Sequence, residues 1–163
     1  MPVALTLHDW LLFLHVLSAF ALVSAEVLFT FLLVTLRKTD VPADIARVSG
    51  TAFLGNSLVG VGSVGVLIFG ILLAFEADSY AIWDGWIIAA IVLWLVFAEV
   101  GRRAGKAYDA AGARARALVA EGRNEPNPEL GVMFRSPTAL WLHVSSMAVV
   151  VLLLLDMIFK PGA

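Results

Sequence analysis

The stretch WLLFLHVLSAFALVSAEVLFTFLLVTL, residues 10–36, is apolar at most positions but carries His15 and Glu26. A membrane-spanning helix needs about 20 predominantly apolar residues, so this segment is long enough to cross a bilayer with some tilt. Ionisable side chains are rare inside membranes and usually face the interior of a helix bundle. The segment therefore predicts a transmembrane helix with a polar, inward-facing side.

Similar apolar segments run at about 51–75, 82–100 and 139–159, and a basic helix and loop are expected at about 101–136. Of the 163 residues, 61% are hydrophobic and only 15% are charged, whereas a soluble domain carries about 25% charged residues. The sequence therefore predicts an all-α integral membrane four-helix bundle. We expect one transmembrane domain over residues 1–163.

The distribution of basic residues predicts the orientation of the chain. Lys160 lies in the tail, and the other ten lie in the connections before the second and fourth spans: Arg37, Lys38, Arg47, Arg102, Arg103, Lys106, Arg114, Arg116, Arg123 and Arg135. Under the positive-inside rule both connections face the cytoplasm and both termini face the non-cytoplasmic side. An outer belt of Trp10, Trp83 and Trp86 and an inner Trp141 fit this orientation. Because topology explains the basic residues, no nucleic-acid partner is predicted.

Polar residues inside the spans are the candidates for a functional site. Counting 1.5 Å of rise per residue places one such residue from each span at similar depth in the inner leaflet: Glu26, Asn56, Glu99 and His143. We expect these four to form one buried site that binds a ligand or cofactor. The alternatives are hydrogen bonds that hold the bundle together and, for Glu99, an interfacial ion pair with the arginines that follow it.

The three histidines raise the question of a metal or a haem. His8 and His15 lie a heptad apart on one helix face, where they are weak candidates for an outer metal site. Imidazole is also an axial haem ligand, so haem b is one alternative cofactor. About 15 Å along the membrane normal separates His15 from His143, which argues against one haem shared by both. Separate haems with Met147 or Met157 as second ligands stay open.

The second span contains many glycines, and Ala52, Asn56 and Gly60 form a small-residue stripe at four-residue spacing. Small residues let transmembrane helices approach closely, so tight helix packing is the favoured interpretation. The alternative is space for a flat ligand such as a macrocycle or quinone. The chain has no cysteine, which excludes disulfides and thiolate metal sites. It also lacks a nucleophile–base pair and a phosphate-binding loop, so enzymatic activity is left undecided.

Three parts of the chain carry a resemblance to a known family: WLLFLHVLSAFAL (residues 10–22), the glycine-rich second span and LLLLDMIFKPG (residues 152–162). Together they resemble a domain-of-unknown-function family of small bacterial four-helix integral membrane proteins. That family is distantly similar to the copper-resistance D-type and HemJ-type membrane proteins. The resemblance implies a multi-pass protein of the bacterial cytoplasmic (inner) membrane, with His15, Lys160 and Pro161 as the matching positions.

Two functions from different classes follow. The first is a membrane protein whose buried polar site, including His15, Glu26 and His143, binds a haem, a metal or another small redox ligand. The second is a non-enzymatic component: an accessory subunit of a membrane complex, or a bundle that conducts protons or ions. Besides the lipid bilayer, a second copy of the chain or a protein of a membrane complex is an expected partner.

Overall fold

The computed structural model describes residues 5–76 and 81–161, and all of the regular structure in these ranges is helical. The helices are α1 (Leu7–Leu36), α2 (Pro42–Gly50), α3 (Ala52–Glu76), α4 (Gly85–Ala120), α5 (Pro128–Arg135) and α6 (Pro137–Phe159). Helices α1, α3, α4 and α6 contain the four segments that are long and apolar enough to cross a membrane. The predicted all-α architecture, with four helices that are each long and apolar enough to span a membrane, is therefore confirmed.

Local sequence signals set the starts of two spanning helices. Thr6 caps α1 through a capping box, in which its side chain accepts from the backbone N–H of Asp9 and the Asp9 carboxylate accepts from the Thr6 backbone. Ser136 caps α6 by accepting from the backbone N–H of Ala139 at 3.2 Å. Pro137 occupies the first turn of α6, where its missing N–H is not needed. Helix α6 thus begins two residues before the expected segment at 139–159.

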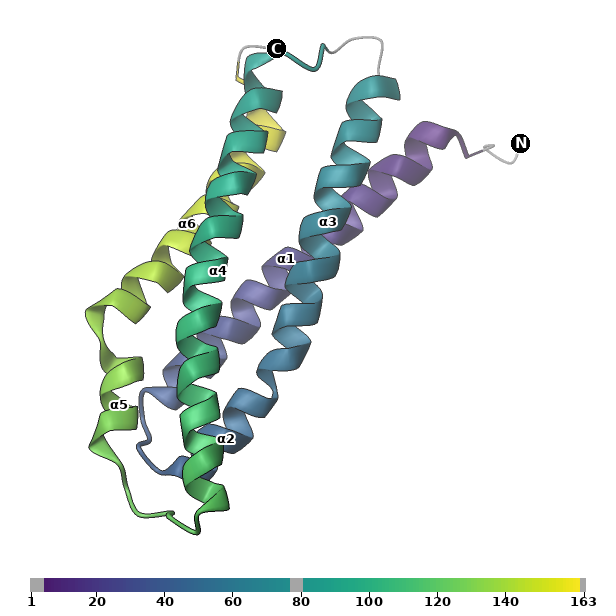
Figure 1. Ribbon diagram of the computed structural model, residues 1–163. Helices are drawn as coiled ribbons and strands as arrows, with labels where there is room; N and C mark the ends of the chain where they lie inside the picture. Colours follow the sequence, from purple (N-terminus) through teal and green to yellow (C-terminus); the bar gives the residue numbers. More distant parts are fainter. Residues whose placement is uncertain (1–4, 77–80, 162–163) are drawn as a thin grey trace.

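The spanning helices pack mainly as two pairs, and α1 crosses between them. Its most extensive packing is against α3, and α4 packs mainly along α6. Figure 1 shows α1 running obliquely, beside α3 near its own start and toward α6 near its end. The start of α1 and the end of α6 lie at one end of the molecule, which we call the terminal end. Helices α2 and α5 and the last turns of α4 lie at the opposite, basic end.

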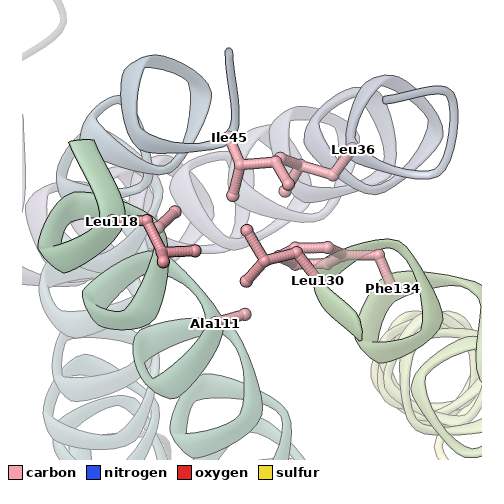
Figure 2. Close-up of a cluster of buried hydrophobic side chains, with 7 residues drawn as sticks. Leu36, Ile45, Ala111, Leu118, Leu130 and Phe134 are labelled. Atoms are coloured by element: carbon pink, nitrogen blue, oxygen red, sulfur yellow. The ribbon is translucent and has the colours of Figure 1, made fainter. Parts of the chain in front are cut away.

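The basic end has a hydrophobic core of its own, formed where α2 and α5 meet the ends of α1 and α4. Helix α4 continues without a break from the third span into this region, as predicted for the basic helix. Helices α2 and α5 were not predicted, because they are short and fall in segments with loop-like composition. Figure 2 shows their side chains converging with those of α1 and α4. The buried residues of this core are Leu36, Ile45, Ala111, Ala115, Leu118, Leu130 and Phe134.

Two smaller clusters lie between the spanning helices. The middle one, called the apolar layer below, consists of Leu22, Phe97, Val149 and Val150. The other lies toward the terminal end and contains Trp86 with Ala74 and Ile87. Trp86 is buried, so its assignment to an outer aromatic belt was wrong. It packs between helices, and the Lys160 ammonium lies 5.3 Å from its ring centre.

The outward faces of the spans are apolar. Phe20, Phe53 and Ile158, for example, are each at least 65% exposed in the isolated chain. Large apolar side chains on the outside are expected where lipid replaces water as the solvent. The polar groups buried between the helices are therefore the exception, and they mark the candidate site.

Candidate functional site

The central feature of the site is the carboxylate of Glu26, which is buried between α1 and α6. Its residue is only 7% exposed. The Ser146 hydroxyl donates a hydrogen bond to Glu26 Oε1 at 2.6 Å. Ser146 is also buried, so this bond joins the two helices in an environment with little competition from water. A hydrogen bond to an ionised group is stronger than one between neutral groups.

One turn further along α1, Thr30 connects Glu26 to His143. The Thr30 hydroxyl donates to the backbone carbonyl of Glu26 at 2.7 Å, and the same oxygen lies 2.9 Å from His143 Nε2. A hydroxyl has one proton to donate. When that proton goes to the Glu26 carbonyl, the bond to His143 requires a proton on Nε2. We refer to Glu26, Thr30, His143 and Ser146 as the polar cluster.

The second oxygen of Glu26, Oε2, is buried and has no hydrogen-bond partner in the part of the chain that the structure describes. An unpartnered carboxylate oxygen away from water is energetically costly, and such groups usually take up a proton or a partner. His143 lies close enough for the charge of Glu26 to act on it. The polar cluster therefore contains two ionisable groups and one free acceptor.

The apolar layer closes the polar cluster on the side facing the terminal end. Leu22 lies about one helical turn from Glu26 along α1, and Val149 and Val150 lie about one turn from Ser146 along α6. Phe97 completes this layer from α4 and is 2% exposed. The polar cluster is thus placed between the apolar layer and the basic end of the molecule.

The structure brings Glu26 and His143 together but does not bring Asn56 and Glu99 to them. Asn56 is on the exposed side of α3. Glu99 accepts hydrogen bonds at 2.7 Å from both Arg102 and Arg103 on the surface of α4, which is the interfacial ion pair considered as its alternative. The reason is helix phase: each residue turns by about 100°, so Glu99 lies about 200° from the buried Phe97.

His15 and His8 lie apart from the polar cluster and from each other. The His15 ring packs against Gly70, where an added Cβ would lie 3.0 Å from His15 Cε1, and its buried Nδ1 has no hydrogen-bond partner among the described residues. His8 Nδ1 lies 2.6 Å from Glu76 Oε2 at the terminal end. Within residues 5–76 and 81–161, no group of three or more His, Asp or Glu side chains is arranged to hold a metal ion.

The residues also do not fit a haem. His143 Nε2 is engaged by Thr30, and Met147 Sδ lies 3.7 Å from the same hydroxyl. Met157 packs instead with the terminal-end cluster around Trp86. The larger of the two best-formed pockets among the described residues has a volume of about 170 Å³, below the several hundred Å³ typical of cofactor sites. No axial pair with room for a macrocycle is formed here.

The glycines of α3 serve helix packing, but through a different face from the expected one. Gly62 and Gly65 are buried against Ser18 and Leu22 of α1. In contrast, a Cβ added at Gly60 would meet nothing within 4 Å, so the stripe of Ala52, Asn56 and Gly60 is not the packed one. Close approach of α1 and α3 leaves no space for a flat ligand at Gly62 and Gly65.

Besides Ser18, two buried polar residues, Ser146 and Asp156, were not predicted as part of a site. Ser146 lies three residues after His143 on the same face of α6, a spacing that the sequence displays. Asp156 is 8% exposed near the terminal end, and its Oδ2 has no hydrogen-bond partner among the described residues. An aspartate within an apolar helix is itself a signal for an inward-facing position.

Comparison of the chain with known protein families, with curated proteins and with solved structures finds no match.

Proposed function

We propose that this multi-pass membrane protein carries a proton-exchanging site, in which Glu26 gains and releases a proton within the polar cluster. The supporting observation is the unpartnered Glu26 Oε2. An ionised carboxylate away from water is unfavourable unless it is fully paired. Ser146 provides one donor to this carboxylate, and protonation would satisfy the other oxygen. This corresponds to the non-enzymatic alternative derived from the sequence.

The arrangement around the Glu26 carboxylate supports proton exchange from the basic end of the molecule. The apolar layer separates the polar cluster from the terminal end, whereas His143 lies toward the basic end, within reach of the charge of Glu26. Imidazole titrates near neutral pH and commonly relays protons. The proton therefore enters and leaves through His143 from the basic end.

Infrared spectroscopy tests the proposal directly, because a protonated carboxylic acid has its own carbonyl stretching band. In detergent-solubilised protein near neutral pH, Glu26→Gln should remove one such band, and transfer to D₂O should shift that band in the unmodified protein. Asp156→Asn is the matched control, since it removes the other buried carboxyl among residues 5–76 and 81–161 and should leave the Glu26 band in place. An unchanged spectrum in the Glu26→Gln protein, or a Glu26 band that never shifts in D₂O, would refute the proposal.

The orientation in the membrane is also a proposal. We place the basic end in the cytoplasm of a bacterial cell, with the protein in its cytoplasmic membrane, as the positive-inside rule and the resemblance to small bacterial membrane proteins suggest. Because the chain lacks cysteine, a single cysteine is a clean probe. In intact cells, a membrane-impermeant maleimide should label Trp83→Cys and should label Lys38→Cys only after the membrane is broken. The reverse pattern contradicts this orientation.

A further inference from the structure

Two buried polar atoms with complementary chemistry lie on α1 and α4. Glu26 Oε2 accepts no hydrogen bond and the buried Tyr108 hydroxyl forms none within residues 5–76 and 81–161. Buried polar groups, tyrosine hydroxyls included, normally find a partner. Oε2 is an acceptor when Glu26 is ionised, and the tyrosine hydroxyl is a donor. Each atom therefore has the chemistry that the other lacks.

Tyr108 lies on the inward face of α4. It follows the buried Phe97 by 11 residues, and a rotation of about 100° per residue returns it to within about 20° of the same side of the helix. Its ring packs against Phe134 of α5, with 5.8 Å between the ring centres. The charge of Glu26 acts on Tyr108. The two side chains are therefore within electrostatic reach of each other although they come from different helices.

The surface of α4 between these two groups is not filled by a side chain. Leu22 and Phe97 belong to the same apolar layer, and α1 and α4 both run from the terminal end toward the basic end (Figure 1). Gly101, about one turn beyond Phe97, is therefore about level with Glu26, and a Cβ added there would meet nothing within 4 Å. Tyr108 begins about 10 Å further along α4, but helical side chains tilt toward the N-terminus of their helix. The Tyr108 side chain thus leans back toward the level of Glu26.

We propose that Tyr108 stabilises the ionised state of Glu26 through one bound water molecule. The water accepts from the Tyr108 hydroxyl and donates to Glu26 Oε2 once the Glu26 proton has left toward His143. Buried water molecules connect polar groups that lack a protein partner, and hydrogen bonds to an ionised group are stronger than those between neutral groups. Tyr108 is thus a positioning residue, and this role rests on the proton exchange proposed for Glu26.

The ionisable groups that face this pair come from three helices: Glu26 and Arg37 from α1 and its end, Asp109 and Arg116 from α4, and His143 from α6. From α2, α3 and α5, the side chains beside Tyr108 are Ser49, Ala52 and Phe134, which carry no charge. A tyrosine hydroxyl keeps its proton up to about pH 10. Removing the Tyr108 hydroxyl therefore changes hydrogen bonding below that pH but does not change the charge.

Infrared titration of the Glu26 carboxyl band in the detergent-solubilised full chain tests the role of Tyr108. Tyr108→Phe removes only the hydroxyl. It should raise the pH at which half of this band has disappeared by about one unit, because a hydrogen bond to the ionised group is lost. Tyr80→Phe, which removes the other tyrosine hydroxyl of the chain, should leave this midpoint unchanged. Arg116→Gln removes a charge but keeps the hydroxyl, so it should shift the midpoint by less than Tyr108→Phe does.

A second measurement detects the hydroxyl itself in protein that retains Tyr108. In the infrared difference spectrum between ionised and protonated Glu26, a tyrosine band that responds to isotope-labelled tyrosine should appear. It should persist in Tyr80→Phe and vanish in Glu26→Gln.

The outcomes distinguish this inference from the proposed function. If the Glu26 band shifts in D₂O but has the same midpoint with and without the Tyr108 hydroxyl, the role of Tyr108 is overturned and the proton exchange stands. A missing tyrosine difference band overturns the role of Tyr108 in the same way. If Glu26→Gln removes no carboxyl band at all, both proposals fail together.

Discussion

The contact between α1 and α3 offers the sharpest test of the packing. A Cβ added at Gly62 would lie 2.9 Å from each of three atoms of α1: the backbone oxygen of Ser18, the backbone nitrogen of Leu22 and Leu22 Cγ. Two of these atoms belong to the backbone, so a side-chain rotation cannot relieve the overlap. Gly62→Ala therefore requires the two helices to move apart. Gly60→Ala, on the same helix, adds its methyl group where nothing lies within 4 Å.

Both variants raise the helix propensity of α3 by the same amount, but only Gly62→Ala creates a steric overlap with α1. Replacing glycine by alanine in a helix stabilises it by about 1 kcal/mol, and overpacking a tight interface typically costs about 1–3 kcal/mol. Gly60→Ala should therefore be stabilising by up to about 1 kcal/mol. Gly62→Ala should fall between neutral and about 2 kcal/mol destabilising. The difference between the two, about 1–3 kcal/mol, isolates the cost of the overlap.

Reversible denaturation in detergent micelles, followed by far-ultraviolet circular dichroism, measures this difference in the free energy of unfolding. The comparison requires both variants in the same detergent, so that micelle effects cancel. If Gly62→Ala is as stable as Gly60→Ala, then α1 and α3 do not approach as closely as described. The assignment of the α3 glycines to packing would then fail.

Three further variants test other parts of the molecule. Leu118→Ala, in the basic-end core, should lower the free energy of unfolding by about 2–5 kcal/mol, whereas the neighbouring, exposed Val119→Ala should have a far smaller effect in the same denaturation assay; equal effects would contradict the burial of Leu118. Ser146→Ala leaves Oε1 of Glu26 without its donor and should cost about 1–3 kcal/mol, and a double-mutant cycle with Glu26→Leu should show most of that loss disappearing. Glu99→Gln breaks an exposed ion pair and should leave both stability and the infrared carboxyl bands unchanged; loss of a buried carboxyl band would return Glu99 to the site.

The long apolar helices could be predicted from the sequence because apolar runs of about 20 residues are rarely found outside membrane-spanning helices. The expected segment at 51–75 became α3, Ala52–Glu76, and the segment at 139–159 became α6, Pro137–Phe159. The ends agree closely because proline and capping residues mark them, as Ser136 does for α6. The short helices α2 and α5 were missed although Pro42 and Pro128 mark their starts, because proline is also common in loops and each helix is too short to show a clear periodic pattern.

The candidate site was only partly predictable because the depth of a residue along its helix and the direction of its side chain around the helix axis are separate quantities. Counting residues along each helix gives the depth, and the structure links Glu26 and His143 through Thr30. The direction in which a side chain points depends on which neighbouring helix its own helix packs against. Helix α3 turns Gly55 toward α1, which leaves Asn56 about 100° away on the exposed side. Whether Glu26 and His143 bind a ligand or a proton stays a prediction.

The core of the basic end has a consequence for how the whole bundle is assembled. Between lipid-facing helices there is little hydrophobic driving force, since lipid is as apolar as the side chains. The basic-end core, with Leu36, Ile45, Leu118 and Leu130 almost fully buried, adds short helices to the ends of the long ones, and any part of it that would otherwise be in water is stabilised by the hydrophobic effect. It ties the end of α1 to α4, and through α2 and α5 it reaches the starts of α3 and α6. The basic-end core thus fixes how the four long apolar helices are aligned at this end of the molecule.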